Sequence, residues 1–155
     1  MEGEIKKYES SSYATAGPEN ATKSVITKHQ LPYHVTRLAE NELIQKLMRS
    51  DNDLLPYILN DLLTQLSIFL EDRYKLVHLG ARTLRDPEEP EWEVIVIIVN
   101  ADFGFKDVEH RFEVEDKIEK IVENVINEWR EKVHKDDVTK VKEANAIISV
   151  IIDET

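Results

Sequence analysis

The chain has no cysteine among its 155 residues, and it has only four glycines and two methionines. The lack of cysteine excludes disulfide bonds, thiolate metal ligands and cysteine nucleophiles. It also fits a reducing compartment, so we expect a cytoplasmic, intracellular protein. With so few glycines, we do not expect nucleotide binding through a glycine-rich turn. Lysine, glutamate and isoleucine are abundant instead, a composition typical of proteins from hot environments.

Long hydrophobic runs and excess positive charge are also missing. No apolar run approaches the length of a membrane span, and the N-terminus lacks a basic segment followed by a hydrophobic one, so we expect neither an anchor nor a signal peptide. The net charge of −11 disfavours duplex binding by phosphate neutralisation. Residues 1–50 nevertheless carry slightly more Lys and Arg than Asp and Glu. A nucleic-acid partner therefore stays open, with metal ions bridging the acidic part of the chain.

The most prominent feature of the chain is the apolar run at residues 94–99, which has six β-branched residues without a polar break. A run this short, bounded by Pro90 and by residues 102–104, is typical of a strand buried on both faces. A second run of this kind lies at residues 146–152. We expect both runs to form strands that are central in a sheet or covered on both sides.

The remaining patterns predict an α+β fold in one domain over residues 29–155, preceded by a flexible tail at residues 1–28. We expect a sheet of about four strands, mainly antiparallel, packed with three helices. The predicted helices cover residues 36–49, 54–72 and 116–133, and the predicted strands cover residues 74–85, 92–100, 108–114 and 145–153.

The strand at residues 108–114 rests on an alternation of apolar and polar residues, and it should lie at a sheet edge. The rival interpretation is a helix over residues 107–133. We prefer the strand because Val108 and Phe112 are out of phase with the apolar positions that follow.

The acidic connection between the first two strands is the first candidate site. Crowded carboxylates hold hard cations, and a pair of Mg²⁺ or Mn²⁺ ions held in this way cuts or joins phosphodiesters in many enzymes. This interpretation makes Asp86, Glu88 and Glu91 metal ligands and gives Glu88 and Glu89 catalytic roles. The simpler alternative is a solvated turn whose charges keep a hairpin soluble.

A second candidate is a set of basic side chains on the predicted sheet. In a simple hairpin register His78, Gly80 and Arg82 share a face, with Asn100 at the same end as His78. A matching register in the next strand places His110 on that face too. Histidine can act as a general base and arginine can hold a phosphate, so His78, Arg82 and His110 are candidate catalytic helpers. The alternative is a partly buried histidine and an arginine that covers the sheet.

Two classes of function follow from these patterns. One is a Mg²⁺- or Mn²⁺-dependent phosphodiester hydrolase or transferase, similar in chemistry to a nuclease. The other is a non-catalytic interaction module or homodimeric binding protein, which uses either the wide leucine face of residues 54–70 or a free sheet edge.

Overall fold

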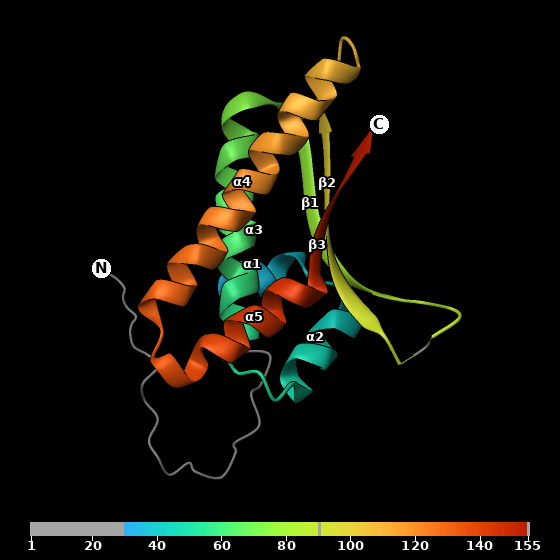
Figure 1. The fold of residues 1–155 in the computed structure, drawn as a ribbon. Helices are drawn as coiled ribbons and strands as arrows, with labels where there is room; N and C mark the ends of the chain where they lie inside the picture. Colours follow the sequence, from blue (N-terminus) through green and yellow to red (C-terminus); the bar gives the residue numbers. More distant parts are fainter. Residues whose placement is uncertain (1–29, 90, 155) are drawn as a thin grey trace.

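The computed structural model describes residues 30–89 and 91–154, so the predicted tail at residues 1–28 lies outside the described part of the chain. Helices α3, α4 and α5 lie on one side of a three-stranded sheet (Figure 1). The elements in chain order are α1 (Tyr33–Leu38), α2 (Asn41–Arg49), α3 (Leu55–Arg73), β1 (Lys75–Arg85), β2 (Glu93–Asp102), α4 (Val108–Lys132), the short 3-10 turn η3 (Lys135–Asp137), α5 (Val138–Ile147) and β3 (Ile148–Glu154).

Helix α3 is the centre of the core, and its position agrees with the helix predicted at residues 54–72. Its leucine face is almost fully buried, with Leu59, Leu62 and Leu66 all 0% exposed. Burying one such side chain contributes about 1.5–3 kcal/mol to folding. The leucine face is therefore interior, and the expectation that it serves as a docking surface is wrong.

The sheet has three strands in the described residues, in the order β1-β2-β3. Strands β1 and β2 form the predicted antiparallel hairpin, with Ala81 opposite Ile97. Strand β3 pairs with β2 in parallel, with Val150 opposite Ile97. Because parallel neighbours need a long crossover, the chain passes through α4 and α5 between β2 and β3. The predicted four-stranded, mainly antiparallel sheet is therefore wrong, while the α+β class holds.

The missing fourth strand is helical. Residues 108–114 form the first two turns of α4, which continues to Lys132. The Asp107 side chain accepts a hydrogen bond from the backbone N–H of His110 at 2.8 Å and caps the helix start. Val114 then follows the same helical face as Ile118, and both are buried. Val108 and Phe112, which suggested a strand, are 66% and 60% exposed on this helix.

Two further differences raise the number of α-helices in the described residues from the predicted three to five. The helix predicted at residues 36–49 breaks at Ala39, which is extended and forms a parallel bridge with Ala81 of β1. The sequence predicts a charged link over residues 134–143, but residues 138–147 form α5, which buries Val141 and Ala144. Lys140, Lys142 and Glu143 interrupt its short apolar stripe in the sequence.

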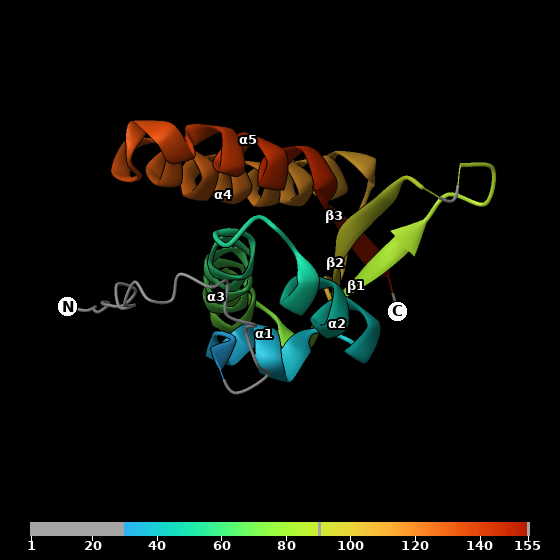
Figure 2. The ribbon, with the colours of Figure 1, turned by 90° about the horizontal axis from the view of Figure 1, so that it is seen from below.

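The two faces of the sheet differ. Ile95, Ile97 and Val99 point toward the helices and are 0% exposed. The described helices lie on that side only (Figure 2). On the other side, which we call the open face, Val94 and Ile98 are half-buried beside exposed Leu84 and Ile151. The strand is therefore central in the sheet, as predicted, with helices on one face only, and on the open face Val96 is 2% exposed between Val94 and Ile98. In the described part of the chain, none of the helices combines the length and apolarity needed to cross a bilayer.

Candidate functional site

The acidic connection forms a tight turn at the tip of the hairpin. The Asp86 carboxylate accepts a hydrogen bond from the backbone N–H of Glu88 at 2.9 Å, and Trp92 N–H donates to the Glu89 carbonyl at 2.9 Å. Asp86 thus acts as the residue that builds the turn. The Glu88, Glu89 and Glu91 side chains are exposed around it.

A metal site at this turn needs converging ligands. Within residues 30–89 and 91–154, no group of three or more His, Asp or Glu side chains is arranged to hold a metal ion. The assignment of Asp86, Glu88 and Glu91 as ligands, and of Glu88 and Glu89 as catalytic groups, therefore stays a prediction from the sequence.

The predicted basic cluster is divided between two places. His78 and Arg82 lie on the open face of β1, opposite Asn100 and Val96 of β2. His110 lies in the first turn of α4, where its Nδ1 accepts from the Lys106 backbone N–H at 3.4 Å. The predicted register for His110 is wrong, because its segment is helical.

The open face carries a polar row, of which the sequence predicted the proximity of His78 and Asn100 but not the third member, Asp153. His78 of β1, Asn100 of β2 and Asp153 of β3 are register partners across the three strands. The Asn100 side-chain oxygen is buried and accepts no hydrogen bond from the described residues. The parallel pairing of β3 creates this row, and no local pattern in the sequence encodes that pairing.

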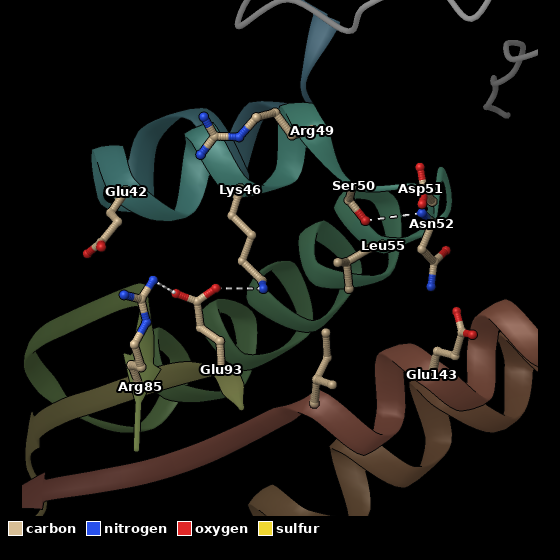
Figure 3. Close-up of a pocket in the computed structure, with 11 residues that line it drawn as sticks. Glu42, Lys46, Arg49, Ser50, Asp51, Asn52, Leu55, Arg85, Glu93 and Glu143 are labelled. Atoms are coloured by element: carbon tan, nitrogen blue, oxygen red, sulfur yellow. Dashed lines mark hydrogen bonds and ion pairs between the residues drawn. The ribbon is translucent and has the colours of Figure 1, made fainter. Parts of the chain in front are cut away.

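A polar cleft of about 730 Å³ lies between α2, the start of α3, α5 and the hairpin strands next to their connecting turn (Figure 3). Its centre is Glu93, whose carboxylate binds Lys46 Nζ at 2.9 Å and Arg85 at 3.0 Å. These two ion pairs connect β2 to α2 and to β1. Figure 3 shows the Arg49 side chain extending along α2 away from Glu93.

The charges inside this cleft largely neutralise one another. The hydrogen bond from Lys46 is the main cause that lowers the pKa of Glu93, and the hydrogen bond from Arg85 adds to it, while burial opposes the shift. A second ion pair, Lys140 Nζ to Asp53 at 2.8 Å, joins α5 to the link before α3. We interpret the charged residues of the cleft as ion pairs that stabilise the packing of neighbouring helices and strands.

The two edges of the sheet have different surroundings. The edge of β1 is partly covered, because Glu40 N–H donates to the Ala81 carbonyl at 2.9 Å. Strand β3 is the other edge, and it has no neighbour beyond β2 in the described chain. Its helix-facing side is apolar, with Ile148, Val150 and Ile152, and on the open face Ile151 is 46% exposed between Ser149 and Asp153. The prediction that this run is central or covered on both sides is therefore wrong.

A groove of about 370 Å³ runs between the free edge of β3 and α4. Its floor is apolar and includes Ile118 and Val122 of α4 with Val150 and Ile152 of β3. Helix α4 packs mainly against α3 and α5, so it leaves this space open beside the strand. The groove and the edge together form the site best suited to binding.

We compared the chain with models of protein families, with curated proteins and with solved structures, and none of them matches.

Proposed function

We propose that the protein is a non-catalytic interaction module that binds an extended segment of a partner protein as an additional strand on β3. The observation that carries this proposal is the position of β3, which has no further neighbour among the described residues, directs Val150 and Ile152 to the groove and leaves Ile151 exposed on the open face. A row of unpaired backbone N–H and C=O groups at such an edge is a template for another strand.

Most proteins protect the edge strands of their sheets, so an edge strand without such protection is informative. Native sheets usually shield their edges with charged side chains, proline, bulges or a covering segment. Residues 148–152 of β3 contain neither a charged side chain nor a proline, and their pairing with β2 is regular. In contrast, the β1 edge is shielded by the bridge from Ala39. The apolar edge of β3 is therefore costly to leave unpaired, and a partner strand removes that cost.

The experiment is a selection of peptides from a random display library with the full-length protein as bait. Hydrogen exchange then locates the bound peptide: strand addition slows exchange of the backbone amides within residues 148–154, because amides facing outward gain acceptors. Failure to obtain peptides, or peptides that protect other segments and leave β3 unchanged, contradicts the proposal.

Two substitutions of matched exposure provide the control. Ile151→Lys places a charge beside the free edge, while Leu84→Lys places one at the opposite edge of the same open face; the two residues are 46% and 47% exposed. We expect Ile151→Lys to weaken the selected peptides at least about tenfold, the equivalent of losing roughly one buried aliphatic contact. Leu84→Lys should leave their affinity within about twofold, since it lies away from β3. The reverse order of the two effects contradicts binding at β3.

A further inference from the structure

The groove beside β3 has an acidic wall as well as an apolar floor. Glu115, Glu119 and Glu123 follow one another at four-residue steps along α4, which brings them to the same side of the helix. Ile118 and Val122 lie between them, Ile118 being 3% exposed. A strand added to β3 therefore has apolar side chains of α4 below it and carboxylates along its flank.

These carboxylates differ in how they are paired. Glu115 binds Arg111 at 3.1 Å, which neutralises it locally. Glu119 and Glu123 form no ion pair with any residue that the structure describes, and both are exposed. Two free negative charges on the rim of an apolar groove favour a ligand that brings positive charges to the rim.

We infer that the segment bound by β3 is basic, and that both its aliphatic and its Lys or Arg side chains lie on the face turned toward α4, the aliphatic ones over Ile118 and Val122 and the cations toward Glu119 and Glu123. This inference rests on the proposed function. Only every second side chain of an added strand faces α4, because successive side chains point to opposite faces. Among the side chains that face α4, an aliphatic one fills the groove over Ile118 and Val122, and a Lys or Arg two positions along the strand reaches the rim.

A second copy of the chain is a poorer occupant of this groove. Strand β3 contains no Lys or Arg and ends in Asp153 and Glu154, so a copy paired through β3 offers no cation to the rim. The net charge of −11 adds repulsion between two copies. A separate basic partner fits the charge of the site, whereas self-pairing does not.

The test uses three synthetic peptides of about eight residues, close to the seven residues of β3. In each peptide the residues of one phase are valine and a variable residue in turn, serine fills the other phase, and the variable residue is lysine, threonine or glutamate. Fluorescence anisotropy with the full-length protein should give the order lysine, threonine, glutamate, with the lysine peptide about tenfold or more tighter than the glutamate peptide at low salt. Its advantage should shrink in about 0.5 M salt, where charges are screened.

Charge reversal on α4 tests which acids are responsible. The Glu119→Lys/Glu123→Lys variant should weaken the lysine peptide by roughly three- to tenfold and should strengthen the glutamate peptide. The Glu128→Lys/Glu131→Lys variant makes the same change of net charge at the C-terminal end of α4 and should leave the order of the peptide affinities unchanged. Equal losses in both variants mean that only net charge matters, and they overturn the inference.

The outcomes separate this inference from the function on which it rests. If all three peptides bind alike and protect residues 148–154, strand addition stands and the basic preference is wrong. If none binds or protects β3, the proposed function fails as well. If the lysine peptide binds only after Val25→Asp/Ile26→Asp, the groove belongs to the chain's own basic segment at residues 23–28, and a separate partner is excluded. Concentration-dependent dimers that exclude the peptide assign the groove to a second copy and overturn the inference.

Discussion

Ile151 of β3 lies opposite Ile98 of β2, and no strand of the described chain lies on the far side of Ile151. Ile98 is half-buried in the central strand, while Ile151 is 46% exposed at the edge. The same type of residue thus has two environments within one row of the open face. That asymmetry is the basis of the interaction proposal, and four further predictions test the structure around it.

The first prediction concerns the carboxylate between Lys46 and Arg85. Glu93→Gln should lower the free energy of unfolding by about 1 kcal/mol at pH 7, because both ion pairs are partly solvated and contribute modestly. The pKa of Glu93 is lowered in the folded protein. Its contribution is therefore complete above the unfolded pKa of about 4.3 and is lost as the pH falls through the lower folded pKa.

Urea denaturation at pH 7 and at about pH 3 measures this difference. The gap between wild type and Glu93→Gln should narrow at the lower pH. Glu91→Gln is the matched control: Glu91 is exposed at the same end of the hairpin and forms no ion pair in the described residues, so its effect should be small at both pH values. If the stability difference persists unchanged at low pH, the ion pairs of Glu93 are not its cause.

The second prediction tests the interior position of the leucine face. Leu62 is 0% exposed and Ile68, on the same helix, is 60% exposed. Leu62→Ala should cost about 2–5 kcal/mol of stability because it leaves a cavity in the core. Ile68→Ala should cost less than about 1 kcal/mol. Chemical denaturation compares them directly, and equal costs would show that α3 is not packed as described.

The third prediction concerns self-association. Because the chain carries a net charge of −11 and its β3 edge is flanked by glutamates, the protein should be monomeric at low salt. Screening should allow more association at high salt, where the Debye length falls from about 10 Å at 0.1 M to about 3 Å at 1 M. Sedimentation at several protein concentrations measures this. A stable dimer at low salt would favour the homodimer expected as one alternative from the sequence.

The fourth prediction addresses the hydrolase hypothesis. If the protein is an interaction module, incubation with linear DNA, single-stranded DNA or RNA should give no cleavage that depends on Mg²⁺ or Mn²⁺. Cleavage that is abolished by a chelator and by Glu88→Gln/Glu89→Gln would favour the hydrolase instead. Asp86→Asn separates the two roles of Asp86, because an amide oxygen can still accept the hydrogen bond from Glu88 N–H while the negative charge is removed.

Local patterns in the sequence predicted the elements that they encode directly. The six leucines of α3 and the unbroken run in β2 needed only periodicity and length, and both elements lie within a few residues of their predicted bounds. Where the local signals conflicted, the prediction failed. Val108 and Phe112 suggested a strand, although Asp107 was available as a helix cap and Val114 was already in phase with Ile118.

The candidate sites also divide into features that local sequence patterns predict and features that only the packed structure creates. The sequence identified the acidic turn, and it predicted correctly that His78 and Arg82 share a face. It did not identify the pairing of Lys46 with Glu93 or the groove between α4 and β3, because these contacts join residues far apart in the chain. No spacing rule relates such residues, so only the packed structure brings them together.

Periodicity and burial within single segments were enough to predict the α+β class, the hairpin, the central apolar strand and the buried leucine helix. The parallel pairing of β3 with β2, and its place at the edge of the sheet, became clear only from the packed structure. This is because a strand has the same local pattern in the middle of a sheet or at its edge. Its neighbours, which are set by the crossover through α4 and α5, determine whether it is covered.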